Sequence, residues 1–348
     1  MRTIVVRNVH QALPEGAYQL KTFGQETSSR NGPVVVLPVP LTTVYLRPTE
    51  RVLFHPERDA NPFFHFFESL WMLKGRNDVA FPKFFNSKFD AFSDDGVTFN
   101  AAYGHRWRNH FGSDQLNRII RALDKDPTCR RQVLAMWDGH HDLGLQSKDL
   151  PCNTQAYFQV DLDGKLQMMV TNRSNDLIWG AYGANAVHFS FLLEYMALSL
   201  GREVGLYYQT SFNTHYYTET HGDLVDKLAA KAPMPPQQYT CPYSEGRVRD
   251  TIPLMSIPRG RWDRELDTFM KLDVGKADPM DKTFVDPFFQ HVASPLLRAY
   301  QAFKSGSATR FEEALQHVGQ CASQDWMVAC QEWLLRRQAK CKIQRSAS

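Results

Sequence analysis

The sequence predicts a protein of mixed α and β structure. Strand patterns and helical patterns both occur along its first two thirds, and helical patterns dominate its last third. β-Branched runs at residues 3–6 and 34–37 indicate strands, and the Asp163-Gly164 turn indicates a β-hairpin. Apolar residues recur at helical spacing in 62–74 and again in 288–335. The 348 residues are enough for one large or two ordinary domains with a substantial core.

The composition excludes several classes of protein. The chain is 43% hydrophobic and 22% charged, as in ordinary globular proteins, and its net charge of +3 is too small to indicate a nucleic-acid or membrane partner. No apolar run approaches the ~20 residues of a membrane span and no signal peptide is recognisable, so we expect a cytoplasmic protein. The six cysteines show no paired C-x-x-C spacing, so we expect neither a metal site nor a disulfide framework.

The first 48 residues alternate β-branched runs with turn-forming stretches, and we expect strands joined by loops. A polar loop that ends in a glycine lies between two of these runs, at residues 29–32, and contains Arg30. An arginine in such a loop is available either to solvent or to an anionic ligand.

A phenylalanine-rich helix is predicted at residues 62–74, closed by Lys74 and Gly75 as a basic last turn and a terminal glycine. Glu68 lies in its middle. If Glu68 is buried among the phenylalanines, its carboxyl group needs a partner or a raised pKa. The alternative is that Glu68 lies on the one wet face of the helix.

Asp114 is expected to cap a helix that runs to Pro127. A strand over 128–137 follows and is entered through the adjacent Arg130 and Arg131. Adjacent residues of a strand point to opposite faces, so both arginines can contact one ligand only at a strand end or across a subunit boundary.

The stretch 150–217 gathers side chains suited to chemistry. Cys152, at the end of the loop that feeds the hairpin, is a candidate nucleophile. After the hairpin, Arg173, Ser174 and Asp176 offer a guanidinium, a hydroxyl and a carboxylate at the exit of a strand. That set suits a phosphorylated substrate.

Two further features of this stretch are polar. The glycine-rich segment 179–185 leads into an apolar helix and holds the amide of Asn185 just before it. His215 and Tyr217 lie on alternate residues at the end of a strand, so their rings point to the same face. A thiol, an anion clamp, an amide and a polar pair are therefore expected to meet.

The last third of the chain changes character. Residues 232–260 are rich in proline and glycine and are expected to be extended, whereas 288–303 has a helical period that Pro295 must kink or divide. Two more helices are predicted up to residue 335, and the basic tail from Arg336 onward is expected to fray. We therefore expect a catalytic core at 1–230, an extended connection at 231–283 and a C-terminal helical extension at 284–342.

Cys152 admits two classes of enzyme and one non-enzymatic reading. A thiol protease or acyltransferase would need a histidine base and an oxyanion hole, and twelve histidines make chance candidates plentiful. In a pyrimidine-modifying enzyme the thiolate adds to C6 of the ring, so that C5 can attack a one-carbon donor. Arginines and Ser174 would then bind the 5′-phosphate, Asn185 would read the ring's amide edge, and an arginine near Cys152 would favour the thiolate. A nucleotide-binding module leaves the cysteine without a purpose.

A series of motifs, in order, carries a resemblance to the thymidylate synthase superfamily over roughly residues 25–220. They are Arg30-Asn31-Gly32, Glu68-Ser69-Leu70-Trp71-Met72-Leu73-Lys74-Gly75, Tyr103-Gly104-His105-Arg106-Trp107-Arg108, Arg130-Arg131, Pro151-Cys152, Arg173-Ser174-Asn175-Asp176 and Thr214-His215-Tyr216-Tyr217. The chain resembles both the thymidylate synthases and the pyrimidine-nucleotide hydroxymethylases of that superfamily. One such motif alone is weak, but the shared order makes the set specific.

The resemblance implies an α/β (α+β) fold with a large twisted mixed sheet and flanking helices. It also implies a homodimer with shared active sites, 5,10-methylenetetrahydrofolate as the one-carbon co-substrate and no metal. The implied catalytic residues are Cys152, Glu68 and Tyr103, and the implied folate contacts are Asp176, Phe89 and Trp71. The implied nucleotide contacts are Arg30, Arg173, Ser174, Asn185, His215 and Tyr217, with Arg130 and Arg131 from the second subunit.

Departures from the thymidylate synthases concern the late half of the reaction. Asn153 stands where those enzymes usually have histidine, and the loop before Asn185 is one residue longer. Phe89 and Phe92 replace tryptophans, and helices replace the short C-terminal segment that closes over folate. Hydride transfer to give dTMP and dihydrofolate needs a closed, dry site. We therefore expect water addition, which gives 5-hydroxymethyl-dUMP, with thymidylate synthase as the alternative.

The base is predicted to be uracil. The amide of Asn185 can donate to O4 and accept from N3–H at once, whereas hydroxymethylases that act on dCMP typically carry aspartate at this position. A dCMP or CMP hydroxymethylase is the less favoured alternative, because the longer loop could turn Asn185 away.

Overall fold

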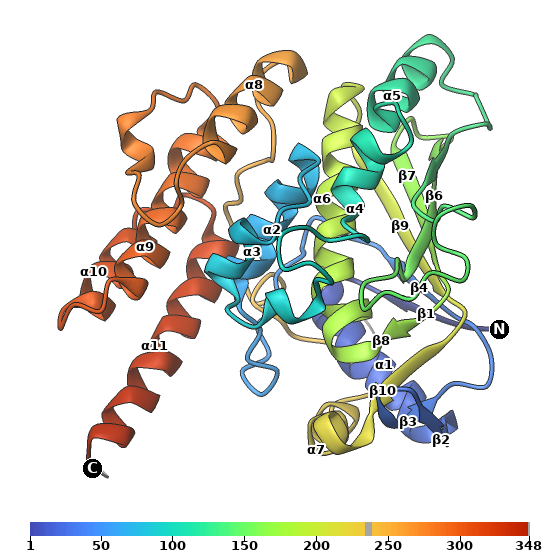
Figure 1. Ribbon diagram of the computed structural model, residues 1–348, viewed down its shortest axis with the longest axis horizontal. Helices are drawn as coiled ribbons and strands as arrows, with labels where there is room; N and C mark the ends of the chain where they lie inside the picture. The colour runs from blue at the N-terminus through green and yellow to red at the C-terminus, as the bar shows by residue number, and fades with distance from the viewer. Residues whose placement is uncertain (234–238, 347–348) are drawn as a thin grey trace.

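The structure is a computed structural model that describes residues 1–233 and 239–346, without the side chains of 344–346 (Figure 1). Its centre is a six-stranded sheet in the order β1-β4-β9-β7-β6-β5, in which β1 and β4, and also β7 and β9, are parallel and the other pairs are antiparallel. The strands are β1 (Arg2–Val6), β4 (Leu41–Tyr45), β9 (Val204–Ser211), β7 (Leu166–Asn172), β6 (Asn153–Val160) and β5 (Val133–Ala135). The predicted large mixed sheet is confirmed.

A smaller, four-stranded sheet lies beside it, in the order β2-β3-β10-β8. Its strands are β2 (Gln25–Ser29), β3 (Gly32–Val36), β10 (Thr214–Tyr217) and β8 (Asn175–Asp176). The chain passes from β7 of the large sheet to β8 of the small one within three residues, since β7 ends at Asn172 and β8 begins at Asn175. Side chains around that step can therefore face both sheets.

The helices form layers on one side of the large sheet. Figure 1 shows α6 (Ala186–Ser199) against the strands, α2 (Pro62–Lys74) beyond it, and the C-terminal helices beyond α2. The remaining helices are α1 (Val9–Phe23), α3 (Ala80–Phe85), α4 (Tyr103–His105), α5 (Gln115–Lys125), α7 (Thr218–Ala229), α8 (Arg259–Met270), α9 (Ser294–Lys304), α10 (Arg310–Val318) and α11 (Gln324–Ser346). Among the described residues, none of the helices is long and apolar enough to cross a membrane.

Helix α2 lies between these layers, which explains its composition. Asn61 caps it by accepting a hydrogen bond from the amide of Phe64 (3.2 Å), Pro62 fits the first turn, and Gly75 ends it with a left-handed φ of 81°. All of its residues except Lys74 are buried, because α6 covers one side and α8 and α11 the other. Glu68 is therefore buried, and the wet-face alternative is wrong.

Several other expectations are confirmed. Asp114 caps α5 by accepting from Asn117, and Gly164 takes a φ of 82° in the β6–β7 turn. Pro295 lies in the first turn of α9 and separates it from the π-helical segment Phe289–Ala293. The hairpin and the helix boundaries could be predicted because short-range geometry decides them.

Other expectations were wrong. Residues 9–23 form a helix capped by Asn8, and the strand predicted at 128–137 is only β5. Helix α8 forms within the passage expected to be an extended connection, of which 234–238 lie outside the described residues. The basic tail continues helix α11, because Arg336, Arg337 and Lys340 all bind Asp59. Each of these outcomes depends on contacts distant in sequence.

Candidate active site

Cys152 lies directly before β6 and beside Tyr103, the first residue of α4. The Tyr103 hydroxyl oxygen accepts the backbone N–H groups of Cys152 (3.0 Å) and Asn153 (3.1 Å). Burial raises the pKa of Tyr103, so the phenol stays protonated. Because the oxygen only accepts in these two hydrogen bonds, the O–H group of Tyr103 is still available to donate a hydrogen bond beside the Cys152 thiol.

The electrostatics around Cys152 are mixed. Burial raises the pKa of the thiol, Arg173 opposes that shift, and Asp149 and Asp176 add to it. The guanidinium of Arg173 donates to the carbonyl oxygens of Pro151 (2.8 Å) and Leu150 (3.2 Å) and so holds the cysteine loop. The expectation that an arginine near Cys152 favours the thiolate describes one contribution correctly, but the net pKa shift is upward.

The amide of Asn185 is fixed on both sides. Its oxygen accepts from the side chain of Asn153 (3.2 Å), and its nitrogen donates to the side-chain oxygen of Asn175 (3.1 Å). The π-helical segment Leu177–Asn185 precedes it, and a Cβ at Gly180 would lie 2.6 Å from that Asn175 oxygen. Glycine is therefore required there for the two amides to meet.

Glu68 faces His188, which lies one turn beyond Asn185 on α6. A carboxylate oxygen of Glu68 lies 3.1 Å from Nε2 of His188, with the two side chains 9% and 3% exposed. The angle between the groups does not suit a hydrogen bond, so both atoms keep unused hydrogen-bonding capacity. A buried polar pair thus lies on the same face of α6 as Asn185.

His215, Tyr217 and Asp176 come together in the small sheet. His215 lies opposite Asp176 in the β10–β8 register, and the rings of His215 and Tyr217 are 5.4 Å apart at 89°. One carboxylate oxygen of Asp176 accepts from the amides of Ile178 and Trp179, whereas the other is buried and has no hydrogen-bond partner among the described residues. Burial raises the pKa of Asp176. The second carboxylate oxygen of Asp176 can therefore accept a hydrogen bond from a ligand.

The other predicted anion-binding residues lie on different parts of the chain. Arg30 is exposed at the β2–β3 turn, and Arg130 and Arg131 are exposed just before β5, the edge strand of the large sheet. Ser174 is half-buried beside Arg173. These groups therefore come from three separate segments of the chain, and three of the four are exposed.

One face of the large sheet is left exposed by the part of the chain that the structure describes. α6 packs on the opposite face against β7 and β9, and alternate strand residues point away from it. The exposed fractions of Val5, Val133, Tyr157 and Met169 are 51%, 43%, 39% and 37%. An apolar face of this kind is typical of a subunit interface.

The predicted folate contacts differ in exposure. Phe89 is half-buried against Phe64 and Phe99, with ring centroids 5.0 Å from each, and Phe92 beside it is 51% exposed. Trp71 is only 3% exposed, and its N–H donates to Asp78 (3.2 Å). Trp71 therefore packs within the core, and its contact with folate stays a prediction.

Sequence reasoning missed Arg58 in the loop before α2. Its Nε donates to the carbonyl oxygen of Ile178 (3.2 Å), and its charge acts on Asp176. The next residue, Asp59, has a φ of 50° and is bound by Arg336 (3.0 Å), Arg337 (2.7 Å) and Lys340 (3.0 Å) of α11. The C-terminal extension thus holds the loop that carries a guanidinium to the site.

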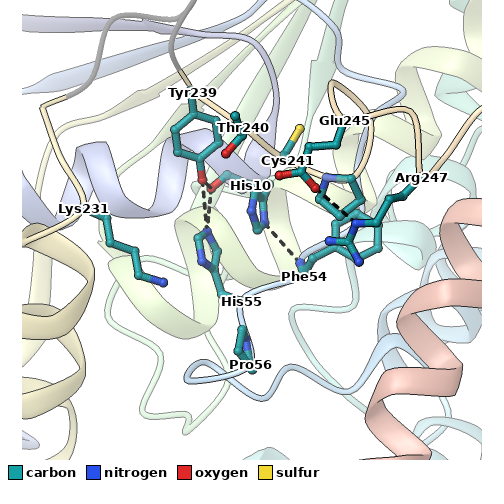
Figure 2. A pocket seen from close by; sticks show the side chains of 11 residues that line it. His10, Phe54, His55, Pro56, Lys231, Tyr239, Thr240, Cys241, Glu245 and Arg247 are labelled. Atoms are coloured by element: carbon teal, nitrogen blue, oxygen red, sulfur yellow. Dashed lines mark hydrogen bonds and ion pairs between the residues drawn. The ribbon is translucent and has the colours of Figure 1, made fainter.

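A separate cavity of about 380 Å³ lies beside α1 (Figure 2). The rings of His10 and His55 stack within it at 3.8 Å, and burial lowers the pKa of both. Lys231 and Arg247 at its wall are each paired with a glutamate. None of the predicted site residues lines it, and its cations already have partners, so we assign no nucleotide to it.

Comparison with known proteins shows the family of the chain. The thymidylate synthase family model matches residues 63–246, more than half of the sequence. The chain belongs to this family. It is 52% identical over 345 residues to the deoxyuridylate hydroxymethyltransferase of Pseudomonas phage M6, which covers 97% of this chain and 95% of the relative. The family recognised from the motif series is confirmed.

More distant relatives match smaller parts of the chain. The deoxyuridylate hydroxymethyltransferase of Bacillus phage SP01 is 42% identical over 194 residues, which is 53% of this chain and 50% of that protein. A putative thymidylate synthase of Methanothermobacter marburgensis is 37% identical over 125 residues, which is 36% of this chain and 54% of that protein.

Proposed function

We propose that the protein is a deoxyuridylate hydroxymethyltransferase, which transfers a one-carbon unit to C5 of dUMP and yields 5-hydroxymethyl-dUMP. The observation that carries the proposal is the direct link between the candidate nucleophile and the candidate base reader. Asn153, the residue after Cys152, donates to the amide of Asn185 at 3.2 Å. A pyrimidine whose C6 meets the Cys152 sulfur can therefore present its amide edge to Asn185.

Cys152 and Asn185 each contribute one part of the activation of the pyrimidine ring. The sulfur forms a bond to C6, and the displaced ring electrons move toward O4 and make C5 nucleophilic. The N–H of Asn185 that is not bound to Asn175 donates to O4 and stabilises the developing negative charge. Tyr103, which burial keeps protonated, helps in the removal of the C5 proton.

The residues beside Asp176 fit a pterin-type co-substrate. The buried, unpartnered carboxylate oxygen of Asp176 suits the N–H groups of such a ring, the exposed edge of Phe89 offers an apolar surface, and Arg58 offers a cation. Methylenetetrahydrofolate would supply the one-carbon unit there. These residues bind and orient it, and a role for Asp176, Phe89 and Arg58 in this binding is part of the proposal.

Water addition is favoured over hydride transfer for two reasons. Glu68 and His188 form a buried pair with unused hydrogen-bonding capacity, and such a pair can hold a water and pass its proton. The relative named hydroxymethyltransferase aligns with 97% of the chain, C-terminal helices included, whereas the relative named as a putative thymidylate synthase aligns with 36%. In the Pseudomonas phage M6 relative, the C-terminal extension therefore occurs together with the hydroxymethyltransferase name.

The phosphate site is proposed to be completed by a second copy of the chain. Arg173, Ser174 and Arg30 would come from the resident chain, and His215 and Tyr217 would bind the sugar hydroxyl. Arg130 and Arg131 lie beside the uncovered apolar face of the sheet, so a dimer formed through that face would carry them toward the neighbouring site. A cytoplasmic location remains a prediction.

The test is to incubate the purified protein with dUMP and methylenetetrahydrofolate, to follow dihydrofolate by absorbance and to identify the nucleotide by mass. We expect 5-hydroxymethyl-dUMP without dihydrofolate, and more rapid turnover of dUMP than of dCMP. Stoichiometric dTMP and dihydrofolate would instead make the protein a thymidylate synthase.

A further inference from the structure

Five buried polar side chains form a closed ring of hydrogen bonds beside Cys152. Asn153 donates to Asn185 (3.2 Å), Asn185 to Asn175 (3.1 Å), Asn175 to the hydroxyl of Ser211 (3.0 Å), Ser211 to Asn172 (3.3 Å), and Asn172 back to Asn153. Their exposed fractions are between 0% and 8%. The ring joins the ends of β6, β7 and β9 to the first residue of β8 and to the last residue of the π-helical segment Leu177–Asn185, directly before α6.

Every member of the ring donates once and accepts once, and all the donors point the same way around it. If one amide turned over, two N–H groups would meet on one side of it and two oxygens on the other. Both contacts would be lost among buried groups that have no water to replace them. Asn185 can therefore reverse its oxygen and nitrogen only if the other members reverse with it.

The orientation of Asn185 matters because uracil and cytosine present opposite patterns at positions 3 and 4. Uracil offers a donor at N3 and an acceptor at O4, whereas cytosine offers an acceptor at N3 and a donor at N4. Once C6 is held at Cys152, the two positions are fixed relative to the amide. One orientation of Asn185 then matches uracil and the reversed orientation matches cytosine.

We propose that Asn153, Asn172, Asn175 and Ser211 are positioning residues that fix the direction of the Asn185 amide and thereby set the preference for uracil over cytosine. This inference rests on the proposed function. It assigns specificity to the whole ring rather than to Asn185 alone, because Asn185 carries both an acceptor and a donor and cannot discriminate unless its direction is held.

The ring offers a matched pair of substitutions. In Asn153→Asp, a carboxylate oxygen faces the Asn185 oxygen, so Asn185 must turn to donate to it, and Asn175 and the Ser211 hydroxyl can turn in response. In Asn175→Asp, the new carboxylate still accepts from Asn185, whose direction is retained. Both variants add the same charge, and both leave the Asn172 oxygen without its donor. They differ only in the direction they impose on Asn185.

The experiment measures the dissociation constants of dUMP and dCMP by calorimetry, and tritium release from C5 of each nucleotide, at about pH 8 where a carboxylate is ionised. For Asn153→Asp we expect the preference for dUMP to fall ~10-fold or more relative to the unmodified protein, since a reversed amide leaves buried groups unpaired against uracil. Asn175→Asp should retain the preference to within ~3-fold, whatever its affinity.

A third variant, Ser211→Ala, opens the ring without adding charge and should lower the preference by a smaller factor, through improved dCMP binding. It keeps the test valid if Asn153→Asp does not fold, which thermal unfolding would reveal. If all three variants keep the same preference for dUMP over dCMP as the unmodified protein, the inference is overturned. If the unmodified protein binds neither nucleotide, the proposed function fails instead, so the two failures are distinguishable.

Discussion

The two ends of the proposed nucleotide site differ in how far a single chain builds them. At the pyrimidine end, Cys152, Tyr103 and Asn185 are tied together by hydrogen bonds of 3.0–3.2 Å within the folded chain. At the phosphate end, Arg30, Arg130 and Arg131 are exposed on the surface of the same chain. In the proposed function, the base is read by a preorganised, buried group of side chains, whereas the phosphate is bound by groups that assemble around it.

This difference has a physical basis. Discrimination between uracil and cytosine requires desolvated donors and acceptors in fixed directions, because a mismatch is costly only where water cannot repair it. A phosphate can be bound by long cationic side chains that approach from several directions. The pyrimidine end should therefore respond to substitutions through the chemical step, and the phosphate end through binding.

The largest effect is expected at the pyrimidine end. Replacing Cys152 with serine removes the thiolate and should lower tritium release from C5 of dUMP by at least ~1,000-fold, since a serine hydroxyl is a far weaker nucleophile. The dissociation constant of dUMP should change little, because the phosphate and the amide edge keep their partners. A serine variant with near-normal tritium release would show that Cys152 is not the nucleophile.

The phosphate end should respond differently. Arg130→Ala and Arg131→Ala are each expected to raise KM for dUMP ~10-fold or more, since a charge-assisted hydrogen bond is lost. Thermal stability should not change, because both side chains are exposed. Arg118→Ala, an exposed arginine of α5 outside the site, is the control.

Sharing of the site between subunits sharpens this prediction. Mixed heterodimers of a Cys152→Ala chain and an Arg130→Ala chain carry one site with both defects and one with neither. In an assay with dUMP well below the raised KM of Arg130→Ala, activity should therefore return on mixing, up to one working site per heterodimer. Its absence in verified heterodimers would mean that each site uses its own Arg130.

A smaller effect is expected at the loop that carries Arg58 and Asp59. Asp59→Asn should lower the free energy of unfolding by about 1 kcal/mol, since partly exposed ion pairs contribute little each, and should raise KM for methylenetetrahydrofolate through displacement of Arg58. Asparagine tolerates the left-handed φ of 50°, so the substitution removes only the charge. Asp267→Asn, which breaks ion pairs with Lys74 and Lys271, is the control for stability alone.

The pH dependence of the contact between Asp59 and α11 follows from the direction of the pKa shift of Asp59. Burial opposes ionisation of Asp59, but Arg337, Lys340 and Arg336 outweigh it and hold the pKa below the ordinary value of 3.8. A lowered pKa stabilises the fold above about pH 4 and loses that contribution as the pH falls through the folded-state pKa. The difference in stability between the unmodified protein and Asp59→Asn should therefore shrink below pH 4.

The smallest effect concerns Asp149, which burial shifts to a pKa of about 6. When ionised, it raises the pKa of Cys152. Asp149→Asn keeps an oxygen to accept the amide of Ala101 and should accelerate alkylation of Cys152 by iodoacetamide ~2–3-fold near pH 7.5. Because a raised pKa destabilises the fold as the pH rises through about 6, the variant should also be the more stable one at pH 8. Equal alkylation rates below pH 5 are the internal control.

Much of the site could be predicted from the sequence because it depends on short-range order. The cap and glycine that bound α2 and the hairpin turn that returns the chain from β6 to β7 are encoded within a few residues. The motif series supplied the candidate roles of Cys152 and Tyr103, and the hydrogen-bonding pattern of a pyrimidine ring supplied that of Asn185. The contacts between these residues could not be predicted from the sequence.

The remainder depends on contacts between distant segments. Asn153, Asn172, Asn175 and Ser211 are unremarkable singly, and only the meeting of the two sheets closes them into a ring. The basic tail was expected to fray because its partner, Asp59, lies more than 270 residues away. The burial of α2 on every side could not be predicted either, because the C-terminal helices that help to cover it lie far along the chain.

The measurement that tests the central claim most directly is the source of the oxygen in the product. The reaction is run in ¹⁸O-labelled water with dUMP and methylenetetrahydrofolate, and the nucleotide is analysed by mass. Authentic 5-hydroxymethyl-dUMP kept in the same water without protein controls for exchange. The account predicts a hydroxymethyl nucleotide that carries one labelled oxygen on the new carbon, with no dihydrofolate. An unlabelled methyl nucleotide with an equivalent of dihydrofolate would contradict it.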